Sequence, residues 1–120
     1  MKRINLFMLS LVVVIVCNAA NAFSQDQKIV VKRYMVERSF PDQLLIPVNV
    51  EGSKICLSVV STNLEDNVTW VHSYVTTDKK KTYCIYDAPS PEAIRKSAAK
   101  NGLPVDNIVE VSVLDPYFYK

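Results

Sequence analysis

The only histidine of the chain, His72, lies in the alternating stretch TWVHSYV and has the widest chemical repertoire of any residue in it. An imidazole can bind a transition metal, exchange protons near neutral pH, or make a polar contact within a core. Glu37 and Cys84 add a carboxylate and a thiol on neighbouring predicted strands. These three ligand types together suit a late divalent ion such as nickel or zinc. We therefore take His72, Glu37 and Cys84 as candidate metal ligands, on the condition that they share one sheet face, because a one-residue change of register reverses the face of Cys84.

Two other interpretations of His72 stay open. With Tyr74 or Glu37 beside it, His72 could be an acid/base group in an enzyme or a small-molecule carrier. It could also be a packing residue in a ligand-free interaction domain. Strict alternation places Val68, Trp70 and Tyr74 on the same strand face as His72. A pocket would be lined by the aromatic residues of the two neighbouring strands, Trp70, Tyr74, Tyr83 and Tyr86.

No catalytic constellation is complete. The sequence contains no Gly-rich phosphate loop, no nucleophile elbow and no Ser-His-Asp order. It therefore favours a binding module over an enzyme.

The first 22 residues have the pattern of a secretory signal peptide. Lys2 and Arg3 precede an apolar run of twelve residues, Leu6 to Cys17, and Ala20 and Ala22 supply the small residues needed for cleavage after position 22. Twelve apolar residues fall short of the ~20 that a spanning helix needs. We predict export to the periplasm or the medium, with no stable membrane anchor after cleavage.

Removal of the signal changes the charge and the cysteine count. Lys2 and Arg3 are two of the 14 basic residues, so the remaining ones equal the 12 acidic residues in number. A neutral chain gives no electrostatic indication of nucleic acid or of an anionic membrane as a partner. Cys56 and Cys84 remain after Cys17 is lost. An oxidising compartment would allow them to form a disulfide. Both also lie in apolar stretches, where free thiols are commonly buried, so a disulfide and two free thiols are both compatible with the sequence.

Patterning predicts a flexible leader over residues 23–27 followed by six elements. In the first strand, Tyr34 and Val36 lie on one face, and Met35 and Glu37 lie on the other. The predicted elements are a strand over 28–38, a helix that includes Val48 and ends near 62, a hairpin of strands over 68–76 and 81–88, a helix from the cap Ser90-Pro91-Glu92 to the stop at Gly102, and a strand over 107–115.

This β-α-β-β-α-β order predicts an α+β, ferredoxin-like fold, in which a four-stranded antiparallel sheet carries two helices on one face. The predicted strands have apolar side chains on both faces, as Tyr34, Val36 and Met35 illustrate, whereas a sheet with one wet face would alternate. We therefore expect a single domain over 28–120. A second copy would cover the open sheet face and form a homodimeric α+β barrel.

Four stretches of the chain, RYMVERSFP, WVHSYV, TYCIYDAPSPEAIRKSAAKNGLP and EVSVLDP, resemble bacterial proteins of the domain-of-unknown-function 4242 family. One branch of that family is described as nickel-binding. The resemblance implies a ferredoxin-like subunit that pairs into a dimer, and it favours nickel, or else zinc, as the ligand. It supplies no ligand set, so His72, Glu37 and Cys84 rest on chemistry and strand parity alone.

Overall fold

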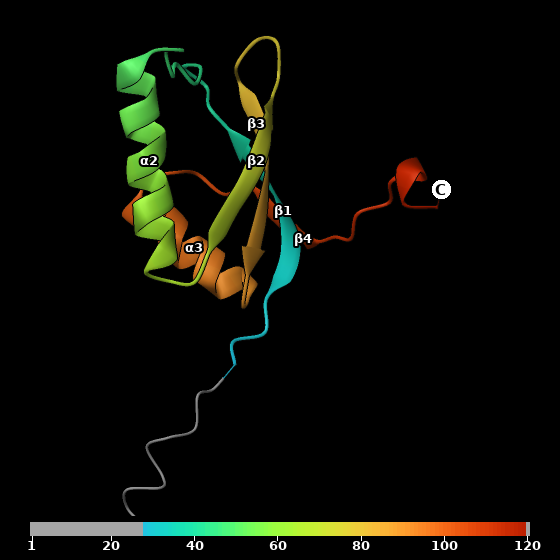
Figure 1. The fold of residues 1–120 in the computed structure, drawn as a ribbon. Coiled ribbons are helices and arrows are strands. Elements are labelled where there is room, and N and C mark those ends of the chain that lie inside the picture. Colours follow the sequence, from blue (N-terminus) through green and yellow to red (C-terminus); the bar gives the residue numbers. More distant parts are fainter. Residues whose placement is uncertain (1–27, 120) are drawn as a thin grey trace, which may run out of the picture.

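The computed structural model describes residues 28–119, which form a four-stranded antiparallel sheet with two helices on one side (Figure 1). The predicted signal peptide and leader lie outside these residues. The order is the predicted β-α-β-β-α-β order of an α+β, ferredoxin-like fold. The elements are β1 (Lys32–Ser39), α2 (Val50–Leu64), β2 (Thr69–Val75), β3 (Lys81–Ala88), α3 (Pro91–Lys100), β4 (Asn107–Glu110) and the short 3-10 helix η1 (Pro116–Tyr119).

The strands lie in the order β2-β3-β1-β4, so β1 pairs with both β3 and β4. Burial alternates along β1: Tyr34 and Val36 are buried, whereas Met35 and Glu37 are only half-buried. The faces predicted for this strand are therefore confirmed. We call the side that carries α2 and α3 the helix face, and the other side the open face.

The core lies between the helix face and α3. Its members are buried apolar side chains, namely Tyr34, Val36, Val68, Cys84, Tyr86, Ala88 and Ile94. Helix α3 begins and ends as predicted: Ser90 Oγ accepts a hydrogen bond from Ala93 N at 3.2 Å, and Gly102 has a φ of 65°. Glycine suits that left-handed position because it has no Cβ.

Helix α2 packs loosely. Val48, which was predicted within this helix, lies before it. The helix begins at Val50, where Asn49 caps it by accepting a hydrogen bond from Gly52 N at 3.0 Å. Only Gly52 and Asn63 of this helix are buried, and Leu57 is 64% exposed. This loose packing leaves a space between α2 and the sheet. Neither helix among the described residues is long and apolar enough to cross a membrane.

Both outer strand ends differ from prediction. The first strand was expected from residue 28 but begins at Lys32, whose partner Ala88 is the last residue of β3. The last strand was expected to reach 115 but ends at Glu110. Beyond it, Val111 N donates to Arg33 O at 2.9 Å, and β1 offers only one further residue for pairing.

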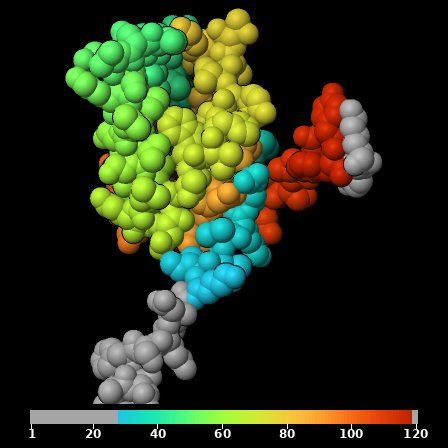
Figure 2. All heavy atoms as spheres, in the orientation of Figure 1, coloured from blue at the N-terminus to red at the C-terminus, as the bar shows by residue number. Residues whose placement is uncertain are grey.

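The chain then leaves the sheet as residues 112–119, which we call the C-terminal arm. The arm projects from the body on the side away from α2 (Figures 1 and 2). It exposes apolar side chains, including Leu114, which is 83% exposed, and Phe118.

Asp66 links the loop after α2 to α3. Its carboxylate lies 2.9 Å from Lys100 Nζ and 3.3 Å from Lys96 Nζ. The hydrogen bond from Lys100 is the main reason why the pKa of Asp66 lies below its usual value of 3.8. A lowered carboxyl pKa stabilises the fold above the unfolded pKa, and this stabilisation is lost as the pH falls through the folded pKa.

We therefore expect Asp66→Asn to be less stable than the parent at neutral pH and to show a shallower loss of stability on acidification. Urea unfolding at several pH values between about 7 and 3 measures this. Asp42→Asn, at an exposed carboxylate outside the described ion pairs, is the control. Parallel pH curves for Asp66→Asn and the parent would contradict the linkage.

Candidate functional site

His72 lies on the open face, where its side chain is exposed. Its ring meets that of Tyr74 edge to face, with ring centroids 5.1 Å apart and planes at 87°. Strand pairing places His72 opposite Ile85, then Met35, then Val109 across the sheet. The imidazole therefore stands at the end of an apolar row.

Glu37 shares the open face, in the next row across the sheet. That row runs from Tyr74 through Tyr83 to Glu37. The Glu37 carboxylate forms an ion pair with Lys81 Nζ at 2.5 Å, which raises the pKa of Lys81. The structure thus places His72 and Glu37 on one face, as a shared site requires. However, strand β3 lies between them, and the Glu37 carboxylate is already paired with Lys81.

Cys84 lies on the helix face, so it does not join His72 and Glu37. It is buried opposite Val36 and Ser73, and its thiol lies 3.4 Å from Thr82 Oγ1. The hairpin register causes this, because it pairs Cys84 with Ser73 and so turns the thiol to the helix face. The prediction of Cys84 as a ligand depended on this register. Cys84 and Cys56 are both free thiols.

Trp70 also departs from prediction, because β2 is not a regular strand. The pairing changes from Trp70↔Tyr86 to His72↔Ile85, which leaves Val71 without a partner as a β-bulge. The extra residue turns Trp70 towards the helix face, where its Nε1 donates to Ser73 Oγ at 2.8 Å. The predicted shared face of Trp70 and His72 is therefore wrong.

The four aromatic residues predicted to line one pocket are divided between the two faces. Tyr74 and Tyr83 lie on the open face, whereas Trp70 and Tyr86 line a cavity of about 500 Å³ between α2 and the sheet. A residue that the sequence analysis missed, Arg38, lines the same cavity. The period of two along RYMVERS could have found it, because it places Arg38 on the face of Tyr34 and Val36.

The described residues do not complete a metal site within one chain. Among residues 28–119, no group of three or more His, Cys, Asp and Glu side chains could hold an ion. His72 offers one exposed imidazole on the open face.

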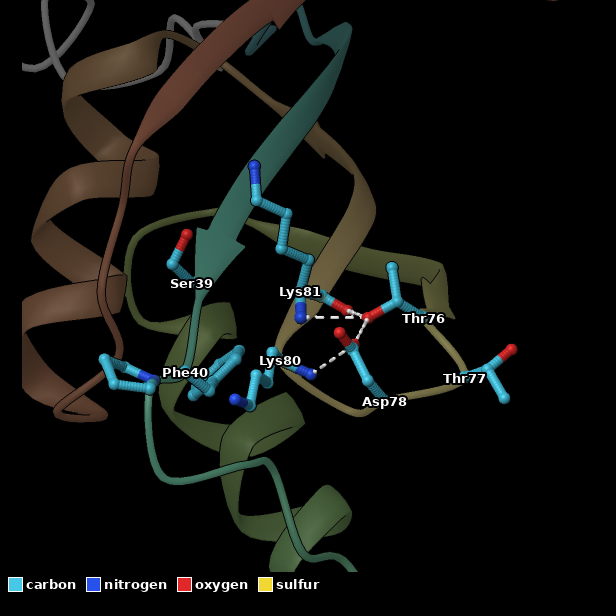
Figure 3. A pocket seen from close by; sticks show the side chains of 8 residues that line it. Ser39, Phe40, Thr76, Thr77, Asp78, Lys80 and Lys81 are labelled. Atoms are coloured by element: carbon cyan, nitrogen blue, oxygen red, sulfur yellow. Dashed lines mark hydrogen bonds between the residues drawn. The ribbon is translucent and has the colours of Figure 1, made fainter.

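A second hollow, of about 560 Å³, lies open to solvent where β1 ends beside the β2–β3 turn (Figure 3). Its polar groups bond to one another: Asp78 Oδ1 accepts from Thr76 Oγ1 at 2.8 Å and from Lys80 N at 3.0 Å. The Lys80 N–H is the main cause of a lowered pKa at Asp78. These hydrogen bonds hold the turn in shape, so the polar groups named here already have partners within it.

Comparisons with known proteins agree with this fold. The structure is similar to the crystal structure of SCO4226 from Streptomyces coelicolor A3(2), with a TM-score of 0.56 and 17% sequence identity, over 69% of this chain and 99% of that chain. At this identity the likeness concerns the fold alone. A search of curated proteins gave no significant match. The family model described as "Nickel responsive protein SCO4226-like" matches residues 34–111, which is more than half of the chain. The protein therefore belongs to the SCO4226-like family.

Proposed function

We propose that the protein is an exported, homodimeric nickel-binding module in which His72 supplies a metal ligand from the open face. The observation that carries the proposal is the position of His72, an exposed imidazole on the sheet face that the helices leave bare. Membership in a family described as nickel responsive supports nickel as the ion. The signal-like first 22 residues support export.

The open face also suits a second copy of the chain. Met35 and Ile85 lie in its centre and remain partly exposed, and Val109 is exposed beside them. Apolar groups left in water favour association, because burying them is worth roughly 25 cal/mol per Å². The C-terminal arm projects from the body on the side away from α2 (Figure 1), and it carries exposed Leu114 and Phe118. A partner subunit that covers the open face and the arm would bury the apolar side chains of both.

Dimerisation would also supply the missing ligands. Nickel binds imidazole well, but one imidazole alone makes a weak site. A second copy placed on the open face adds its own His72 and Glu37 to the same interface. We therefore propose that the metal site forms between subunits, with His72 of each chain as its nitrogen donor.

The test is calorimetric titration of chelator-stripped protein, residues 23–120, with nickel and then zinc. We expect His72→Ala to lower nickel affinity at least about tenfold, since even outer-shell partners of metal ligands cost that much. Asn107→Ala is the matched control, because Asn107 is an exposed open-face residue without a metal-binding group at neutral pH.

Sedimentation equilibrium of the same samples tests the interface. Nickel affinity in the parent should fall when the protein is diluted below its dimer dissociation constant. Full affinity in His72→Ala would remove His72 from the site. Full affinity in a monomeric parent would contradict a site between subunits.

A further inference from the structure

The cavity beneath α2 is separate from the open face, because the sheet lies between them. Its volume of about 500 Å³ is within the range of small-molecule sites. Apolar side chains form most of the wall: Leu44, Ile46, Ile55, Val59, Trp70 and Leu103. Such a wall suits the apolar body of a ligand.

Among the residues that the structure describes, one charged side chain lines this cavity. Arg38, whose guanidinium carries a positive charge, is 2% exposed. Its Nη1 donates to Pro104 O at 2.5 Å, and its Nη2 donates to Tyr86 Oη at 3.2 Å. Nε is buried and has no hydrogen-bond partner.

No carboxylate neutralises Arg38 within residues 28–119. The nearest acidic residue in sequence, Glu37, points to the open face and pairs with Lys81. The partners that Arg38 does have are neutral, a carbonyl and a phenol. Charges that are buried in proteins are normally paired, because desolvation otherwise makes them costly. An anion in the cavity would supply what is missing.

We propose that this cavity is a binding site for a small apolar monocarboxylic acid, whose carboxylate pairs with Arg38 and whose body lies against α2. A carboxylate fits the planar donor fork of arginine. Burial raises the pKa of Tyr86, so its phenol stays protonated beside the site and adds no negative charge. Ser73 and Thr82 offer further hydroxyl groups along the wall.

The loose packing of α2 provides the room. Ile55, Cys56 and Val59 line the cavity from one side of the helix without filling it. Tight packing of these side chains on the sheet would have closed the space, as interiors normally do.

The test uses decanoate as the probe, titrated below its micelle concentration into the same protein and followed by calorimetry. Decanol is the matched neutral probe, and acetate is the matched probe without a chain. We expect decanoate to bind at least about tenfold more tightly than either, which is about 1.4 kcal/mol. Arg38→Met should remove this preference over decanol while leaving nickel binding unchanged. Arg95→Met, at an exposed arginine of α3, makes the same change in charge and should bind as the parent does.

Val59→Trp keeps the proposal testable even if Arg38→Met fails to fold. It fills the cavity from half-buried Val59 without touching Arg38, and it should abolish decanoate binding. Equal affinity for decanoate and decanol would overturn the role of the charge. Unchanged decanoate binding in Val59→Trp, or no binding to the folded parent, would overturn the site.

Discussion

Gly52→Ala is expected to lower the free energy of unfolding by about 1–3 kcal/mol, the usual cost of overpacking. Elsewhere in a helix the same change would raise stability by about 1 kcal/mol. The difference lies in the contact made by the first turn of α2. A Cβ at position 52 would lie 1.7 Å from Pro47 O and 3.3 Å from Ile46 Cγ2. Chemical denaturation measures the effect.

Ser53→Ala is the matched control, because Ser53 is the next residue of the same helix and is exposed. It should change stability by no more than about 0.5 kcal/mol. Since Ile46 also lines the cavity, Gly52→Ala should weaken decanoate binding as well. A variant as stable as the parent would show that the 44–47 segment moves aside freely.

Ile94→Ala is expected to cost about 2–5 kcal/mol, the usual range for truncating a buried isoleucine. Ile94 is 1% exposed, and it is the only residue of α3 in the main core cluster described above. A domain of this size has a stability of only about 5–15 kcal/mol, so the loss is a large share. Thermal unfolding should show it as a drop of about 4–8 °C for each kcal/mol.

Leu57→Ala serves as the control, at an exposed leucine of α2. Its effect should stay within about 0.5 kcal/mol, because almost no packing is lost. Equal losses for Ile94→Ala and Leu57→Ala would mean that the core is not built around α3.

Local sequence signals predicted most of the fold because each acts within a few residues. Ser90 with Pro91 sets the start of α3, and Gly102 sets its end. The alternation of Tyr34, Met35 and Val36 gave both faces of β1 correctly. These features depend on backbone geometry and not on distant contacts.

The candidate site was harder to predict because it depends on register. Cys84 and His72 were grouped on the condition of a shared face, and pairing of Cys84 with Val36 places the thiol in the core instead. The bulge at Val71 has no local signal, since TWVHSYV contains neither glycine nor proline. The cavity was not predictable either, because the apolar residues of α2 lie on several sides of the helix and do not reveal how closely it packs.

The unpaired Val71 has a consequence for how the length of this strand can vary among relatives. A chain that lacked Val71 would have Trp70 followed directly by His72, and simple alternation would then keep Trp70 on the helix face and His72 on the open face. Loss of any residue from 73 to 75 would instead exchange the two faces for part of the strand. A one-residue deletion in β2 therefore keeps every side chain on its present face only at the bulge. Among relatives, length differences in β2 should fall at that position.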